Sequence, residues 1–202
     1  MTVPGASGST VADARESAHA LIEQLARILG EAGLDAVLIG GQAVNTWAEP
    51  RVTMDVDLTV VARGDAIRRA VEALQNEGFV LERLQDFGQA SGPDFVRLID
   101  SRTSLGLDIQ VAKTEFEDSL LARAVRSAGQ SLPVASPEDL IVMKLIANRS
   151  KDQKDLFDLG AREGIDWPYV ERWAEVWQVA DRLVSLRAAL REDQERVKEL
   201  FS

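Results

Sequence analysis

The sequence contains no cysteine and a single histidine, His19, among its 202 residues. The absence of cysteine excludes disulfide frameworks, cysteine-ligated zinc, thiol nucleophiles and iron–sulfur clusters. A serine–histidine triad or a histidine-rich metal site would have to use His19, which lies in an ordinary helical pattern. Any chemistry must therefore rest on carboxylates, lysines and the backbone.

Long apolar segments are also missing, since no run approaches the roughly 18 residues that a membrane span needs. Residues 1–10 are rich in Gly and Ser and lack the basic and apolar regions of a secretion signal. We therefore expect a flexible tail at residues 1–10, no membrane attachment and a cytoplasmic protein. The formal net charge of −10 disfavours broad binding to nucleic acid, because it repels polyanions.

Apolar periodicity predicts strands and helices over the first two thirds of the chain. Spacings of three and four over residues 11–33 are typical of a helix, and the apolar run 36–39 predicts a buried strand before Gly40 and Gly41. A helix can begin after this glycine pair, at residues 42–47. The remaining patterns predict strands at 53–60, 79–84, 95–99, 104–111 and 132–135, and helices at 65–77 and 115–128.

The last third of the chain reads as helical. Ser136 and Pro137 fit the N-cap and first positions of a helix, and helical periodicity continues to Ser202 with a break near Gly164. This distribution predicts an α+β fold. We expect a catalytic core at residues 11–135 followed by a helical region at 136–202.

The strand at residues 53–60 carries a pair of carboxylates. Because residues two apart on a strand point the same way, Asp55 and Asp57 should project side by side, about 7 Å apart along the backbone. Two such anions repel unless a cation stabilises both, and an all-oxygen pair suits Mg²⁺. The alternative is that they only solvate an exposed face of the sheet, which for an isolated Asp-x-Asp is the commoner outcome.

Asp108 is the natural third carboxylate, because it lies on the polar face of another alternating strand, beside Gly106. Three carboxylates on neighbouring strands could hold two metal ions, one for the attacking hydroxyl and one for the leaving pyrophosphate. Gly40 and Gly41 strengthen this reading, since glycines between a strand and a helix expose backbone N–H groups to a phosphate.

These segments, LIGGQAV at residues 38–44 and RVTMDVDL at 51–58, resemble the signature of the DNA polymerase β-type nucleotidyltransferase superfamily. They are similar in particular to the branch of AbiE-type (type IV) toxins and small antibiotic nucleotidyltransferases. The resemblance implies a mixed β-sheet flanked by helices. It also implies that Gly40 and Gly41 bind nucleotide phosphates, and that one or two Mg²⁺ ions are bound by three catalytic aspartates, Asp55, Asp57 and Asp108.

The resemblance extends to about residue 160, through Lys144 on an apolar helix and the segment containing Asp155. Where relatives often carry Arg or Ser before the carboxylates, this chain has Thr53, whose hydroxyl can still donate. Lys144 could contact phosphate, with Asp155 orienting it, or simply extend its ammonium to solvent. The aspartates at 152, 155 and 158 are by composition more typical of a solvated helix face. Arg51 could reach a triphosphate or pair with Glu49.

Two functions remain open at this stage. The first is transfer of a nucleoside monophosphate (NMP) from a nucleoside triphosphate (NTP) such as ATP to an acceptor hydroxyl, with Asp108 as the base. The resemblance implies tRNA or protein as acceptor, and a cognate antitoxin as partner, whereas the acidic composition suits a cationic small molecule. The second is a catalytically idle binding or regulatory module on the same fold.

Overall fold

The computed structural model describes residues 11–62, 65–86, 93–126 and 129–200, so the tail expected at residues 1–10 lies outside the described residues. Five strands form one sheet: β1 (Asp35–Ile39), β2 (Asp55–Val61), β3 (Phe79–Gln85), β4 (Phe95–Asp100) and β5 (Gly106–Val111). Helix α1 (Val11–Glu31) precedes the sheet, α2 (Gly40–Trp47) and α3 (Ala66–Asn76) lie between strands, and α4 (Glu115–Arg123) follows the last strand. The C-terminal helices are α5 (Pro137–Ala147), α6 (Asp152–Gly160), α7 (Trp167–Val176) and α8 (Ala180–Leu200).

The sheet is mixed, with the strand order β1-β2-β5-β4-β3. Only β2 and β5 run parallel, and the other three pairs of neighbours are antiparallel. On its other side β2 pairs with β1 in a short antiparallel pair, and α2 connects these two strands. This order brings three segments that are far apart in the sequence, namely the residues after β1 and the first residues of β2 and β5, to one region of the sheet.

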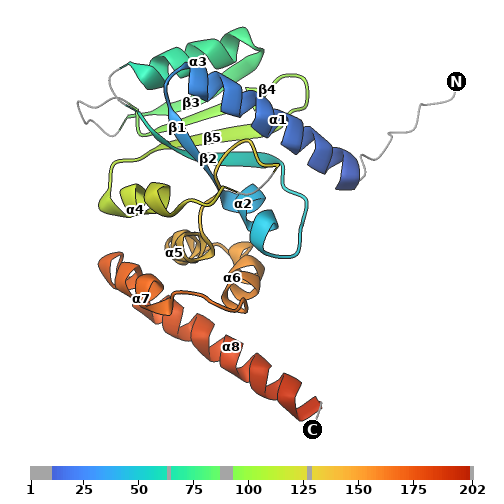
Figure 1. The fold of residues 1–202 in the computed structure, drawn as a ribbon, viewed down its shortest axis with the longest axis vertical. Coiled ribbons are helices and arrows are strands. Elements are labelled where there is room, and N and C mark those ends of the chain that lie inside the picture. Colours follow the sequence, from blue (N-terminus) through green and yellow to red (C-terminus); the bar gives the residue numbers. More distant parts are fainter. Residues whose placement is uncertain (1–10, 63–64, 87–92, 127–128, 201–202) are drawn as a thin grey trace, which may run out of the picture.

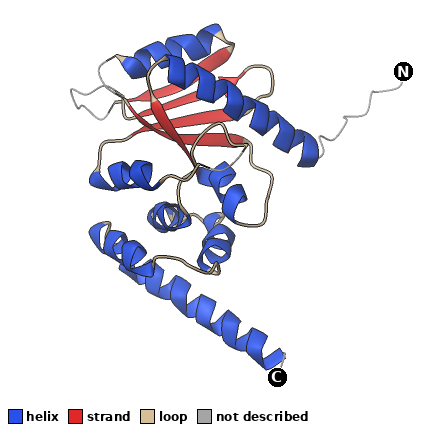
Figure 2. Cartoon of the chain, viewed as in Figure 1, coloured by secondary structure: helices blue, strands red, loops and turns tan. Residues whose placement is uncertain are grey.

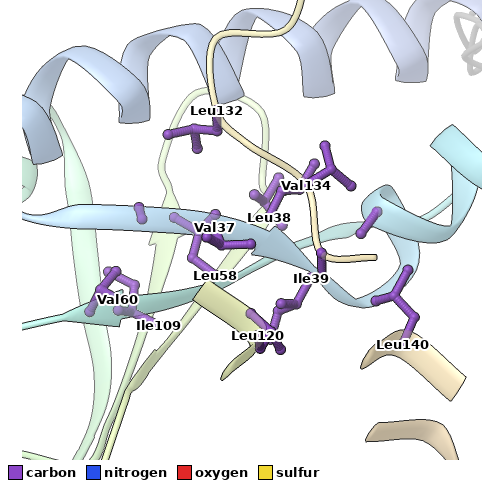
Figure 3. Close-up of a cluster of buried hydrophobic side chains, with 14 of the residues drawn as sticks. Val37, Leu38, Ile39, Leu58, Val60, Ile109, Leu120, Leu132, Val134 and Leu140 are labelled. Atoms are coloured by element: carbon purple, nitrogen blue, oxygen red, sulfur yellow. The ribbon is translucent and has the colours of Figure 1, made fainter. Parts of the chain in front are cut away.

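The two faces of the sheet differ in what covers them. Helices α1 and α3 lie along one side, and α2, α4 and α5 lie on the other, as Figures 1 and 2 show. Val56, Leu58 and Val60 of β2 are fully buried, together with Leu107 and Ile109 of β5. Figure 3 shows part of this core, with Leu58, Val60 and Ile109 of the sheet, and with Ile39 of β1 near Leu120 of α4. Burial of this apolar layer leaves the alternate residues of β2 and β5 to face the second group of helices.

The C-terminal helices pack beneath this second group, and α8 extends away from the sheet towards the C-terminus (Figure 1). As expected, α5 begins with Ser136 as N-cap, whose hydroxyl accepts the Asp139 backbone N–H, and Pro137 at the first turn. Asn148 ends this helix in the left-handed conformation. None of the helices in the described ranges is long and apolar enough to cross a membrane.

The expected α+β class, with a mixed sheet and a helical C-terminal part, is confirmed, whereas several boundaries differ. β2 begins at Asp55, and Met54, which the strand predicted at residues 53–60 included, is exposed. Residues 132–135 do not form a strand, because Val134 makes only isolated bridges, to Leu38 and Val125. The glycine pair is part of α2, which begins at Gly40 and not at residue 42.

Candidate active site

The three aspartates predicted from the sequence lie on one face of the sheet. In the parallel register between β2 and β5, Asp57 is the partner of Asp108, and Asp55 is the partner of Gly106. Residues paired across two strands point to the same side, so Asp57 and Asp108 are direct neighbours. The apolar residues that alternate with these aspartates along β2 and β5 all face the core. Their burial fixes the register in which the two strands pair.

Two glycines make room for these carboxylates. A Cβ atom at Gly40 would lie 2.0 Å from Asp57 Oδ2, and Gly40 also has a positive φ of 63°. A Cβ at Gly106 would lie 2.3 Å from Asp55 Oδ1. Both positions therefore require glycine, since a side chain at either would displace a carboxylate. The Gly-Gly turn and the Asp-x-Asp strand are thus in direct contact.

The carboxyl group of Asp57 has a strongly raised pKa. Burial raises its pKa to about 6, and the negative charges of Asp108 and Asp55 add to the rise. A hydrogen bond from the Gly41 backbone N–H and the charge of Arg149 oppose it. Burial likewise raises the pKa of Asp108, in this case against the opposing effect of Arg97. The site thus has an excess of negative charge that a bound cation would relieve.

An arginine that the sequence did not single out lies among these carboxylates. The Arg97 Nη1 atom on β4 donates to both oxygens of Asp108, at 2.8 Å each, and Nη2 donates to Asp55 Oδ1 at 3.2 Å. Its Nε atom donates to Glu82 Oε2 on β3 at 2.9 Å. The side chain is 29% exposed. Arg97 therefore holds Asp55 and Asp108 together from the neighbouring strand.

A second group of charges lies near the site, and its lysine and two aspartates are buried. The Lys144 ammonium, whose residue is 4% exposed, donates to Asp155 Oδ2 at 2.6 Å and to Asp152 Oδ1 at 2.9 Å. Arg51 donates two hydrogen bonds to Asp155, at 2.8 and 2.6 Å, and Arg149 donates two to Asp152, at 2.6 and 3.2 Å. This network of three cations and two anions carries one excess positive charge.

The aspartates of this network are stabilised as anions. Burial acts to raise the pKa of Asp155, but hydrogen bonds from Arg51 and Lys144 lower it overall. Burial opposes the shift at Asp152 too, and its pKa is lowered by Arg149 and Lys144. The interpretation of residues 152, 155 and 158 as a solvated helix face is therefore wrong for the first two, which are almost completely buried. Arg51 pairs with Asp155, not with Glu49.

A cleft of about 420 Å³ opens beside the sheet and joins the two groups of charges. Its charged lining comes from Asp57 and Asp108 of the sheet, from Glu117 of α4, from Lys144 of α5 and from Arg149 just after that helix, and Gln110 of β5 adds an amide. Gly40 contributes the backbone at the start of α2. The rest of the lining is mostly apolar, with four large side chains, Phe95, Phe116, Met143 and Trp177.

Four of the nine site residues predicted from the sequence line this cleft, namely Gly40, Asp57, Asp108 and Lys144. The other five surround it without lining it. Asp55 lies beside Arg97, and Asp155 lies behind Lys144. A Cβ at Gly41 would lie 3.0 Å from Thr53 Oγ1 and 3.5 Å from Arg51 Nη2, so these three residues lie together.

The carboxylates fit a hard divalent ion in part. Within the described portions of the chain, no three His, Cys, Asp or Glu side chains are grouped closely enough to hold a metal by themselves. Mg²⁺ is however usually bound by one or two carboxylates and completed by water and substrate phosphates. The pair Asp55 and Asp57, with the raised pKa of Asp57, meets that requirement, whereas Asp108 is already bound to Arg97.

Arg97, Arg149 and Asp152 are the site residues that sequence reasoning missed. The alternation of β4 does place Arg97 on the polar face, between the buried Val96 and Leu98. The sequence pattern does not predict that β4 pairs with β5, and it is this pairing that makes Arg97 the partner of Asp108. Ser136 and Pro137 predict where helix α5 begins, but nothing in the sequence pattern predicted where it ends. The position of Arg149, just after that end, was therefore not predictable.

The sequence over residues 17–198 matches the model of a family described as "Nucleotidyltransferase of unknown function (DUF6036)", and the chain belongs to that family. This family membership agrees with the nucleotidyltransferase activity expected from the resemblance. No curated protein matches the chain.

Two solved structures show the same fold at low sequence identity. One is the solution structure of the antibiotic-resistance factor ANT(2'')-Ia, which is 17% identical and has a TM-score of 0.50. The match covers 92% of this chain and 97% of that chain. The other is an antigenic nucleotidyltransferase-like protein from Paracoccidioides brasiliensis, 16% identical, with a TM-score of 0.51 and coverage of 88% and 94%. Both likenesses extend over almost the whole chain, and so include the helical C-terminal part.

Proposed function

We propose that the protein transfers an NMP group from an NTP to an acceptor hydroxyl, with Mg²⁺ as cofactor. The observation that carries the proposal is the pairing of Asp57 with Asp108 at the cleft, with the Gly40 backbone packed against Asp57. Family membership supports the reaction class. A cluster of anions beside a helix start has a ready chemical use in binding a metal and a triphosphate.

Each part of the site has a role in this reaction. Asp55 and Asp57 would hold Mg²⁺, which would neutralise charge on the triphosphate and on the leaving pyrophosphate. The cationic network, through Lys144 and Arg149 at the cleft, offers its excess positive charge to the phosphates. Asp108 keeps lone pairs that Arg97 does not use, and it accepts the proton of the acceptor hydroxyl.

For the acceptor we propose a cationic small molecule. The net charge of −10 attracts cations and repels a polyanion such as tRNA. The cleft wall formed by Phe95, Phe116 and Trp177 also gives a compact apolar surface and not a basic groove. The resemblance to toxins makes tRNA and protein the alternatives, with a cognate antitoxin as partner of such a toxin.

The test is transfer of label from α-³²P-labelled NTPs in the presence of Mg²⁺, with an aminoglycoside, tRNA or protein as acceptor. The wild type should label one acceptor, with ATP tried first, and Asp57→Asn should lose the activity. Asp181→Asn, an exposed aspartate on α8, is the matched control and should keep it. Labelling of tRNA or protein alone would replace the acceptor proposed above, and equal activity of Asp57→Asn would refute the mechanism.

One observation favours the idle module as a second candidate. Arg97 already neutralises part of the carboxylate cluster, as a structural ion pair would. An idle module should bind NTP without turning it over and without a need for metal. Binding of an NTP in EDTA as tightly as in Mg²⁺, with no label transferred to any acceptor, would favour this candidate.

A further inference from the structure

Arg97 occupies the space between two of the three aspartates that would otherwise share metal ions. We propose that Arg97 is a fixed cation in the place of a second metal, so that the site holds one Mg²⁺ ion, on Asp55 and Asp57. This inference rests on the proposed function, because it concerns the metal requirement of the same site. It differs from the two-metal arrangement that three clustered carboxylates would suggest.

The position of Arg97 follows from the sheet. Arg97 on β4 is the register partner of Asp108 on β5, and Gly106, two residues before Asp108, is the partner of Asp55 on β2. A Cβ at Gly106 would lie 2.3 Å from Asp55 Oδ1 and 3.1 Å from Arg97 Nη2. The absence of a side chain at residue 106 therefore lets the guanidinium cross β5 and reach Asp55 on the next strand but one.

The hydrogen bonds of Arg97 hold it in that position. Nη1 is shared by both oxygens of Asp108, Nη2 binds Asp55 Oδ1, and Nε binds Glu82 on the far side. A planar guanidinium that binds three carboxylates at once is restrained in orientation as well as in place. Lysine has a single point charge on a flexible stem and cannot make the same set of bonds.

Charge balance agrees with one metal ion. Arg97 and one divalent ion balance the three negative charges that the three aspartates carry when ionised, whereas Glu82, which Arg97 also binds, is 55% exposed and faces solvent. A second divalent ion would have to enter within reach of the guanidinium and share Asp108 with it, and like charges at such a distance repel. Arg97 takes up only the Oδ1 atom of Asp55, so that Oδ2 remains for the ion held with Asp57.

The experiment counts bound ions by electron paramagnetic resonance, titrating Mn²⁺ into the protein saturated with α,β-methylene-ATP. The wild type should bind one ion per complex of protein and nucleotide. The Arg97→Gln variant should bind two Mn²⁺ ions per complex. Its affinity for the second ion should be at least tenfold higher than that of the wild type. Arg68→Gln, which removes an exposed positive charge on α3 across the sheet, is the control and should bind one.

Several outcomes would overturn the inference. Two ions on the wild type, or none, contradict it directly. Arg97→Gln that still binds one ion, with a lower melting temperature in EDTA, would mean that Arg97 only supports the fold. Failure of the proposed function is a separate result: a wild type that binds one ion but transfers no NMP leaves the role of Arg97 standing, whereas transfer with two ions bound removes this inference alone.

Discussion

The backbone of Gly40 lies against the carboxylate of Asp57, so closely that a Cβ atom at residue 40 would come within 2.0 Å of Oδ2. The contact follows from the β1–β2 pairing, in which Ile39 is the partner of Asp57 and the chain then turns into α2. Gly40 makes this turn at a φ of 63°. The glycine pair and the carboxylate pair are thus in direct contact, although Gly40 and Asp55 are 15 positions apart in the sequence.

Gly40→Ala should therefore strongly reduce activity. The left-handed conformation costs a residue with a side chain about 1–2 kcal/mol, and the methyl group must also push the Asp57 carboxylate away. Displacement of a reacting group by about 1 Å can reduce the rate about 100-fold, which we expect in the label-transfer assay. Gly30→Ala in α1 is the control, because nothing lies within 4 Å of its Cβ position. Equal activity of both variants would contradict the role of Gly40.

The buried network predicts a large difference between two lysines. Lys144→Met leaves Asp152 and Asp155 buried with one partner fewer each, which should lower the free energy of unfolding by about 3 kcal/mol. Lys154→Met removes a lysine whose side chain is 63% exposed and pairs with Asp158, so the loss should stay within about 1 kcal/mol. Urea denaturation at neutral pH measures both. Similar losses would mean that Lys144 does not stabilise the buried aspartates.

The part of the site that the sequence predicted is the part encoded by strand alternation. Asp55 and Asp57 share a face because they are two residues apart on one strand, and the same logic places Gly106 and Asp108 together. Once the apolar residues of both strands are buried against α1 and α3, both polar faces must lie on the other side of the sheet. That reasoning needs no knowledge of the strand order, and the structure agrees with it.

The part that could not be predicted depends on strand pairing and helix packing. Arg97 reaches Asp108 only because β4 lies beside β5, and alternation within β4 says nothing about its neighbour. Asp152 and Asp155 looked like solvated residues because their spacing suits an exposed helix face. They are buried because α6 packs against α5, where Lys144 supplies the counter-charge. A sequence pattern alone cannot distinguish an exposed acidic stripe from one that meets a buried lysine.

The raised pKa of Asp57 predicts a pH dependence of stability. The folded chain holds a proton on Asp57 up to about pH 6, whereas the unfolded chain loses it near 3.8. Between those values the folded state binds more protons, so the contribution of Asp57 to stability falls as pH rises. Removal of the carboxyl group in Asp57→Asn removes this loss. The stability of the variant minus that of the wild type should therefore increase by on the order of 3 kcal/mol from pH 4 to pH 7.

The measurement is urea denaturation of both proteins in EDTA at several pH values. Taking the difference between them cancels the carboxylates that do not interact with Asp57, including Asp152 and Asp155, whose lowered pKa values act in the opposite direction. A difference that does not change with pH would show that Asp57 titrates normally in the folded protein. The same series in Mg²⁺ should flatten the difference, because a bound divalent ion keeps Asp57 ionised.

Magnesium should stabilise the wild type through the same residue. A ligand that binds only the folded state adds RT ln(1 + [L]/Kd), which is about 2.7 kcal/mol at a hundredfold excess over Kd, or about 5–10 °C for a chain of this length. Asp57→Asn should melt in EDTA at or slightly above the wild-type temperature, since one of the repelling charges is gone, and Mg²⁺ should no longer raise it. Asp181→Asn, exposed on α8, should respond to Mg²⁺ as the wild type does. If Asp57 served the fold alone, its variant would melt several degrees lower with or without the ion, and Mg²⁺ would leave the wild type unchanged.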